Sequence, residues 1–217
     1  MYYVIGDIHG CFSKITALYG KISSRIGPDD WLIFLGDYID RGEHSFEVVE
    51  FLIGLGRRHP VVFIKGNHES MFMDYLAGKD IQKIYYQNGG ERTVDSYTRQ
   101  FGYFHVPGTH RFFFNSLRAY FEEKEFIAVH AGLNPKIYIM ESQNEEDMIW
   151  IREKFFRSPR KWEKTVIFGH TPTAALTGGR FSVYRDPERN IIGIDTGAVY
   201  GGTLTCLRWP DMAEFHA

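Results

Sequence analysis

The sequence predicts an α/β fold, and two observations support this prediction. Short apolar runs of strand length recur along the chain, and helical patterns separate the first three runs. A short polar cluster follows five of these runs, at the carboxyl ends of strands, where α/β proteins carry their ligands. With 217 residues, the chain is long enough to form one domain with a full hydrophobic core.

Seven apolar segments are predicted to be buried strands. Each is short, most contain β-branched residues, and each ends in glycine or polar residues. The segments are residues 2–5, 31–35, 61–64, 126–129, 166–168, 191–194 and 204–207.

Two amphipathic helices are predicted between the first strands. The first has apolar residues on one helix face, and the second has a similar pattern that ends before Gly56. Their apolar positions are Ile15, Leu18, Tyr19 and Ile22, then Phe46, Val49, Phe51, Leu52 and Leu55. Residues 71–120 contain many aromatic residues but no long strand pattern. We therefore expect a mostly helical insertion there, within a single domain of residues 1–217.

Composition excludes several classes of function. A hydrophobic content of 44%, a charged content of 24% and a net charge of -2 are typical of a soluble globular protein. This charge gives no overall attraction to nucleic acid or to an anionic membrane, and no run approaches the ~20 apolar residues of a membrane span. Cys11 and Cys206 lie far apart, which favours a reduced cytoplasmic protein, although a disulfide stays open.

The polar clusters contain side chains that bind metal ions. They read GDIHG at 6–10, GDYIDRG at 36–42, GNHE at 66–69, HAG at 130–132 and GHTP at 169–172. Carboxylate, amide and imidazole groups that all follow strands are hard to explain as unrelated structural residues. The predicted metal ligands are Asp7, His9, Asp37, Asn67, His130 and His170.

This ligand set predicts a dinuclear site. The two oxygens of Asp37 can bridge two cations, and metal ions roughly 3.5–4 Å apart serve in-line displacement at phosphorus. Mixed imidazole and oxygen ligation favours Mn²⁺, with Fe, Zn, Co or Ni as alternatives, over Ca²⁺ or Mg²⁺. A structural zinc site is not expected, because spaced cysteine pairs are absent from the sequence.

In their order along the chain, the clusters resemble the phosphoprotein phosphatase branch of the calcineurin-like metallophosphoesterases. They are most similar to compact bacterial and lambda-phage-type serine/threonine protein phosphatases, and the segment IDTGAVYGG at 194–202 fits that group. The resemblance implies a β-sandwich of two mixed sheets flanked by helices, with two metals at one edge. It assigns Asp7, His9 and Asp37 to the first metal, and Asp37, Asn67, His130 and His170 to the second.

The resemblance also implies the catalytic groups. His68 corresponds to the general acid and Asp40 to the carboxylate that orients it, whereas Arg41 and Arg152 correspond to phosphate-binding arginines. Two simpler readings stay open: Asp40 pairs with Arg41 at the surface, and Arg152 faces solvent on a helix. Tyr200 is expected near the site by analogy, and Asp195 is expected to contact one of the ligand histidines.

The expected activity is hydrolysis of phosphoserine or phosphothreonine in proteins or peptides, with dual specificity as a variant, by direct attack of a metal-bridging hydroxide on phosphorus. The alternative is symmetrical cleavage of bis(5'-nucleosyl) tetraphosphates, or hydrolysis of other nucleotides or small phosphate esters. Asp40 favours the protein phosphatase reading, because the related bacterial tetraphosphatases tend to lack an acidic residue there. A non-catalytic metal-binding scaffold is a remote alternative.

Overall fold

The computed structural model describes residues 1–217 and contains two mixed five-stranded sheets. The first sheet has the order β10-β9-β1-β2-β3, in which β1, β2 and β3 are parallel and β9 is antiparallel to both of its neighbours. Its strands are β1 (Tyr2–Ile5), β2 (Trp31–Phe34), β3 (Val61–Phe63), β9 (Thr205–Trp209) and β10 (Glu214–His216). Both ends of the chain therefore belong to this sheet.

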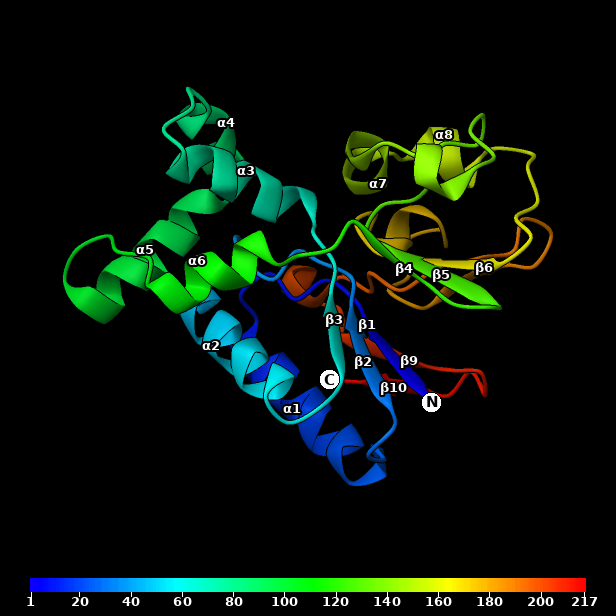
Figure 1. The fold of residues 1–217 in the computed structure, drawn as a ribbon, viewed down its shortest axis with the longest axis horizontal. Helices are drawn as coiled ribbons and strands as arrows, with labels where there is room; N and C mark the ends of the chain where they lie inside the picture. The colour runs from blue at the N-terminus through cyan, green and yellow to red at the C-terminus, as the bar shows by residue number, and fades with distance from the viewer.

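The second sheet has the order β4-β5-β6-β8-β7, with β5, β6 and β8 parallel and the two edge strands antiparallel. Its strands are β4 (Tyr120–Glu122), β5 (Phe126–Val129), β6 (Thr165–Phe168), β7 (Tyr184–Asp186) and β8 (Ile191–Gly193). Figure 1 shows β4, β5 and β6 on the side of the molecule away from the helices α1 and α2.

The two sheets pack face to face through aliphatic side chains. Because side chains alternate along a strand, β1 sends Val4 between the sheets and Tyr3 and Ile5 to the opposite face. The layer between the sheets combines Val4, Ile33, Val62, Phe126, Ala128, Ile167, Ile192 and Leu207. This layer fixes how the carboxyl ends of the two sets of parallel strands lie relative to each other.

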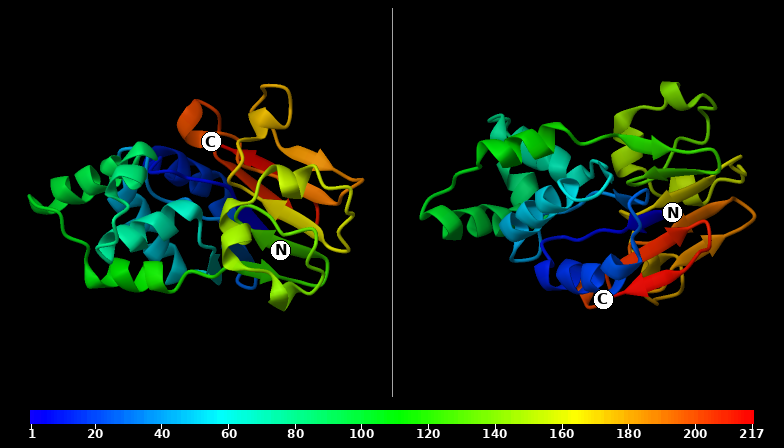
Figure 2. Two further views of the ribbon diagram at one scale, coloured as in Figure 1. Left: turned by 90° about the horizontal axis from the view of Figure 1, so that it is seen from above. Right: turned by 60° about the horizontal axis from the view of Figure 1, so that its bottom comes forward.

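Helices cover the other face of the first sheet. Helix α1 (Phe12–Ile22) buries Ile15, Leu18 and Ile22, and α2 (Ser45–Gly56) buries an equivalent apolar stripe. Four further helices follow β3, namely α3 (Asn67–Leu76), α4 (Gln82–Gln87), α5 (Gly90–Phe101) and α6 (Gly108–Asn115). They share one aromatic-rich core with α1 and α2, and they extend away from the sheets in Figures 1 and 2.

The outer face of the second sheet carries a smaller core. Helices α7 (Glu145–Trp150) and α8 (Glu153–Phe156) bury Met148, Phe155 and Phe156 against β5 and β6. Figure 2 shows these short helices beside the second sheet, well separated from the larger helical group. No helix of the chain combines the length and apolar character needed to cross a membrane.

The predicted fold class is confirmed: the fold is α/β, with two mixed sheets flanked by helices. The seven predicted strands lie at or within two residues of β1, β2, β3, β5, β6, β8 and β9. The strands β4, β7 and β10 were not predicted from the sequence, and each lies at a sheet edge. These three strands are partly exposed and lack a continuous apolar run, whereas β3, which also lies at an edge, keeps one.

Candidate active site

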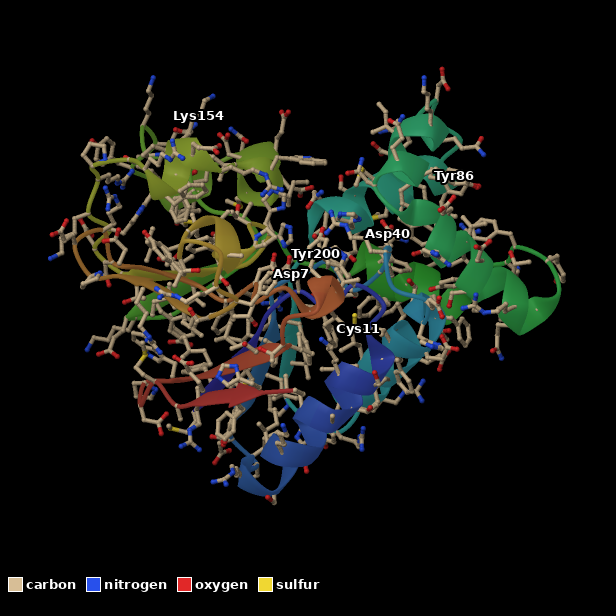
Figure 3. The ribbon with its side chains drawn as sticks, turned by 180° about the vertical axis from the view of Figure 1, so that it is seen from behind. Asp7, Cys11, Asp40, Tyr86, Lys154 and Tyr200 are labelled. Atoms are coloured by element: carbon tan, nitrogen blue, oxygen red, sulfur yellow. The ribbon has the colours of Figure 1, made fainter.

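The five polar clusters meet at one place because they follow parallel strands that end at the same edge of the sandwich. They lie after β1, β2 and β3 of the first sheet and after β5 and β6 of the second. All six predicted metal ligands are at least 95% buried. Figure 3 shows Asp7, Asp40 and Tyr200 near the centre of the molecule, between Lys154 on α8 and Tyr86 on α4.

The backbone of these loops is strained where it presents the functional side chains. His9, Asp37, Asp40, Arg41 and His170 have φ values of 46°, 51°, 69°, 66° and 62°. Residues other than glycine rarely adopt this left-handed backbone conformation. Those that do cluster at functional sites, where the surrounding structure enforces the conformation. Five of the seven non-glycine residues with positive φ in this chain are predicted site residues.

His9, Asp37 and His68 form one group of converging ligand atoms, all within 4.8 Å of one another. The Nδ1–H of His9 donates to the carbonyl oxygen of Ile39 at 3.0 Å, which assigns the lone pair of this ring to Nε2. That Nε2 atom lies 3.4 Å from Oδ2 of Asp37. A neutral imidazole held in this tautomer is suited to bind a metal ion.

Asp37, His130 and His170 form a second group that shares Asp37 with the first. The Nδ1–H of His130 donates to the carbonyl oxygen of Leu35 at 2.8 Å, so its Nε2 carries the lone pair. This Nε2 lies 3.1 Å from Oδ1 of Asn67, 3.2 Å from Nδ1 of His170 and 3.5 Å from Oδ1 of Asp37. Several electron-pair donors therefore face one small space.

Asp7 reaches the same region from β1. Its Oδ2 accepts a hydrogen bond from the backbone N–H of His170 at 2.9 Å, whereas its Oδ1 is buried without a partner. Only glycine fits at position 169, because a Cβ there would lie 2.1 Å from Oδ1 of Asp7. A ligand oxygen is thus available at this position.

The buried polar atoms of the site fit divalent cations. Asp7 Oδ1 has no hydrogen-bond partner, although a buried polar atom normally has one, and Nδ1 of His170 faces Nε2 of His130 at 3.2 Å. Burial, together with the carboxylates of Asp195 and Asp37, raises the pKa of Asp7 well above its usual value. Burial also lowers the pKa values of His9, His130 and His170 and keeps these rings neutral. Bound cations would accept electron pairs from these oxygen and nitrogen atoms. Their charge would also offset the negative charge of the neighbouring carboxylates.

His68 and Asp40 form a buried pair beside the metal-ligand groups. Nδ1 of His68 lies 2.7 Å from Oδ2 of Asp40, and both side chains are fully buried. The other oxygen of Asp40 accepts hydrogen bonds from the hydroxyls of Tyr85 and Thr93 at 2.8 and 2.6 Å. The simpler reading of Asp40 as a surface partner of Arg41 is therefore wrong.

Arg41 contacts the site through His9 and Tyr200. Its Nη1 donates to Nε2 of His9 at 2.6 Å, and its guanidinium carbon lies 5.5 Å from the ring centroid of Tyr200. The backbone N–H of Arg41 donates to the carbonyl oxygen of Gly89 at 3.1 Å. A Cβ on Gly89 would lie 2.8 Å from Cγ of Arg41, so the close approach of these segments requires glycine.

Arg152 reaches the site from the second sheet. It lies between α7 and α8, and its Nη1 donates to Oγ1 of Thr171 at 3.1 Å and to the carbonyl oxygen of His170 at 3.4 Å. The side chain therefore contacts the GHTP loop instead of facing away into solvent. Arg41 and Arg152 bring positive charge to the site from the two sheets of the sandwich.

Sequence reasoning gave no role to Glu69, which joins two of the loops. Its Oε2 accepts hydrogen bonds from the backbone N–H groups of Asp37 and Gly66 at 2.8 and 3.0 Å, and its Oε1 accepts one from Tyr38 at 2.8 Å. Burial and the nearby Asp37 raise the pKa of Glu69 to about 8. Its position in GNHE was a usable signal, whereas no local pattern indicates that Tyr85 and Thr93 hold Asp40.

The sandwich of two mixed sheets and the ligand cluster at its edge define a metallophosphoesterase. A model of the calcineurin-like phosphoesterases matches residues 2–203. The chain belongs to the calcineurin-like phosphoesterase family.

Comparison with individual proteins agrees with this assignment. The chain is 27% identical to an asymmetrical bis(5'-nucleosyl)-tetraphosphatase of Anoxybacillus flavithermus, and the alignment covers 98% of this chain and 91% of that enzyme. A second such tetraphosphatase, from Geobacillus thermodenitrificans, is 29% identical over 96% of this chain and 90% of that enzyme. The crystal structure of a candidate diadenosine tetraphosphatase matches with a TM-score of 0.75 and 21% identity, covering 100% of this chain and 92% of that one.

Proposed function

We propose that this protein hydrolyses dinucleoside tetraphosphates asymmetrically, converting diadenosine tetraphosphate to AMP and ATP. The observation that carries the proposal is the nearly end-to-end alignment with enzymes of that name. The alternative weighed from the sequence is thus favoured over the protein phosphatase reading, and the relatives' names indicate the asymmetrical form of cleavage.

We assign two divalent cations to this site, in agreement with its geometry. Asp7, His9 and Asp37 would hold one ion, and Asp37, Asn67, His130 and His170 the other, with Asp37 shared. The two observed groups of converging atoms support this division in part: they share Asp37, with His9 in one group and His130 and His170 in the other. The first group also contains His68, which we assign to proton transfer, and Asp7 and Asn67 are added from the sequence. Imidazole and oxygen ligands favour Mn²⁺ among the available ions. Such ions lower the pKa of bound water and offset charge on phosphoryl oxygens.

The side chains around this site have separate tasks in the proposed reaction. Arg41 and Arg152 bind and orient the phosphoryl oxygens of the attacked group. Water adds to phosphorus while the bond to the bridging oxygen breaks, and that oxygen keeps the electron pair. His68 donates a proton to the departing oxygen, and Asp40 keeps its ring oriented through the 2.7 Å contact at Nδ1.

The second candidate is hydrolysis of phosphoserine or phosphothreonine. The buried pair of His68 and Asp40 favours it, because the alkoxide released from such esters needs a proton far more than a nucleotide does. The proposed site can in principle perform either reaction. The preferred substrate therefore depends on contacts between the protein and the part of the substrate beyond the attacked phosphate.

A substrate panel tests the proposal directly. Diadenosine tetraphosphate, a phosphoserine peptide and p-nitrophenyl phosphate are assayed with Mn²⁺, Fe²⁺, Co²⁺, Ni²⁺, Zn²⁺ and Mg²⁺, and nucleotide products are separated by chromatography. We expect equal amounts of AMP and ATP, fastest with Mn²⁺, and a kcat/KM for the tetraphosphate about a hundredfold above that for the peptide. A hundredfold preference for the peptide would overturn the proposal, and ADP as the only product would show symmetrical cleavage.

A further inference from the structure

A cavity of about 410 Å³ adjoins the candidate active site on the side of the second sheet. Trp150, Arg152 and Lys154 contribute to its lining, at the junction of α7 and α8. Its volume lies within the ~300–1,000 Å³ typical of small-molecule sites. None of the predicted metal ligands lines it, so it is separate from the metal-ligand cluster.

Arg152 links this cavity to the reacting centre. Its guanidinium contacts Thr171 and the backbone of His170, and His170 belongs to the second group of metal-ligand atoms. The Trp150 ring lies nearby, with its centroid 6.1 Å from the His170 centroid and the two planes nearly perpendicular at 88°. A molecule in the cavity is therefore adjacent to a phosphoryl group bound at the site.

The indole of Trp150 is available for stacking. Trp150 is 42% exposed although it ends a helix beside the site, and its ring makes an edge-on contact with the ring of His170. Tyr200 is 49% exposed but already lies against the guanidinium of Arg41. An exposed tryptophan next to a phosphate site is a platform for a planar base.

The charges in the cavity orient such a ligand. Arg152 provides positive charge beside the site, and Lys154 adds a second positive charge to the lining. Glu146 and Glu153 also line the cavity, and their carboxylates disfavour a second phosphate but accept hydrogen bonds from ribose hydroxyls or a base amino group. Asp147 is already engaged by the side-chain amides of Asn134 and Asn144 at 2.8 Å. The phosphate end thus lies toward Arg152 and the nucleoside end toward Trp150.

From these contacts we infer that the cavity beside Trp150 is the subsite for the nucleoside attached to the attacked phosphorus, with Trp150 stacking on its base. This inference rests on the proposed function and adds a reason for asymmetrical cleavage. Because the Trp150 and His170 rings are neighbours, a base stacked on Trp150 brings the phosphorus joined directly to its nucleoside nearest to the metal ligands. Water then adds its oxygen to that phosphorus, the bond to the bridging oxygen breaks, AMP carries the new oxygen, and ATP leaves with the electron pair.

Hydrolysis in H₂¹⁸O tests the orientation without any mutation. We expect one ¹⁸O in AMP and none in ATP, measured by mass spectrometry. Label in ATP instead would overturn the inference while leaving the proposed function intact. Two ADP products would likewise overturn it, because the attacked phosphorus would then lie one phosphate further from the nucleoside.

Variants of Trp150 test the stacking. We expect Trp150→Leu to raise KM for diadenosine tetraphosphate about tenfold more than KM for p-nitrophenyl phosphate, and Trp150→Phe to retain most of the discrimination. The matched control is Trp31→Leu, since Trp31 is 37% exposed at the start of β2, at the end of that strand away from the site. Equal changes in both KM values for folded Trp150→Leu would overturn the role of Trp150.

Inhibition by nucleotide fragments keeps the test independent of the proposed function. With p-nitrophenyl phosphate as substrate, AMP is compared with ribose 5-phosphate as inhibitor of the Mn²⁺-loaded enzyme. We expect AMP to bind about tenfold more tightly, and this preference to disappear in Trp150→Leu but not in Trp31→Leu. If the unmodified protein binds both fragments equally, the subsite inference is wrong, whatever the tetraphosphate assay shows.

Discussion

Nδ1 of His68 lies 2.7 Å from Oδ2 of Asp40, and neither side chain is exposed to solvent. The second oxygen of Asp40 is held by Tyr85 and Thr93, which come from α4 and α5. The orientation of the imidazole is thus fixed through Nδ1, while its Nε2 has no hydrogen-bond partner within the protein. Burial lowers the pKa of His68, but Asp37 and Asp40 outweigh this effect and the pKa lies above its usual value. The ring is equipped to donate a proton from Nε2.

Replacement of His68 by Asn should reveal the need of the leaving group for this proton. We expect kcat for phenyl phosphate to fall about 10²–10⁴-fold, because its phenolate is a poor leaving group. For p-nitrophenyl phosphate we expect a loss of about tenfold or less, since its leaving group is stable without protonation. Steady-state rates with Mn²⁺ measure both effects. Equal losses on the two esters would show that His68 is not the proton donor.

Replacement of Asp40 by Asn tests whether the two residues act as one unit. The kcat of this variant for phenyl phosphate should fall almost as far as that of His68→Asn, because an amide cannot stabilise the protonated ring. The double variant should then be little slower than His68→Asn alone, since residues in one network are not additive. Multiplicative losses in the double variant would instead assign Asp40 a task separate from His68.

The parts of this site that follow buried strands could be predicted from the sequence. Asp7, Asp37 and Asn67 were identifiable because glycine-flanked polar residues after apolar runs form a local signal. Tyr85 and Thr93 were not, because they meet Asp40 only through the packing of α4 and α5. A similar distinction applies to the missed strands β4, β7 and β10, whose partial exposure at sheet edges weakens the apolar pattern, whereas the edge strand β3 keeps the apolar run Val61–Phe63.

The shared position of Asp37 predicts an unequal effect of ligand replacements on metal content. Asp37→Asn should bind little of either metal ion, whereas His170→Ala should retain about one of the two ions per chain. Elemental analysis after dialysis against dilute Mn²⁺ measures the stoichiometry, and His105→Ala is the control because His105 is exposed and outside the site. Dialysis against a chelator should abolish activity, with Mn²⁺ restoring it. Two ions retained in both variants would contradict the assignment.

Glu69 should matter for stability because it satisfies three backbone N–H groups of the site loops. In Glu69→Ala these donors lose a buried acceptor, and we expect the free energy of unfolding to fall by about 3 kcal/mol or more. Urea unfolding of the metal-free protein measures this loss separately from metal binding. The control Glu145→Gln removes an exposed partner of Lys65 and should change stability by less than about 1 kcal/mol. Similar values for the two variants would argue against the bridging role of Glu69.

His110 provides a test of stability against pH away from the metal ligands. It is fully buried, with Nδ1 2.7 Å from the hydroxyl of Tyr97 and Nε2 2.7 Å from Oε1 of Glu50. Burial lowers the pKa of His110, although Glu50 opposes this effect. Below the unfolded-state pKa of about 6.5, the unfolded chain therefore binds a proton that the folded chain resists. The contribution of His110 to stability is present above that pH and is lost as the pH falls.

The variant His110→Gln should weaken this pH dependence, because glutamine keeps a donor for Glu50 and an acceptor for Tyr97 but does not titrate. We expect the decrease in Tm between pH 7.5 and pH 5.5 to be smaller in this variant than in the unmodified protein. The control is His44→Gln, since the His44 side chain is 53% exposed. Thermal unfolding of the metal-free proteins measures the slopes. Parallel curves for all three proteins would show that the pKa of His110 is the same in the folded and unfolded chains. That result would contradict the lowering of its pKa by burial.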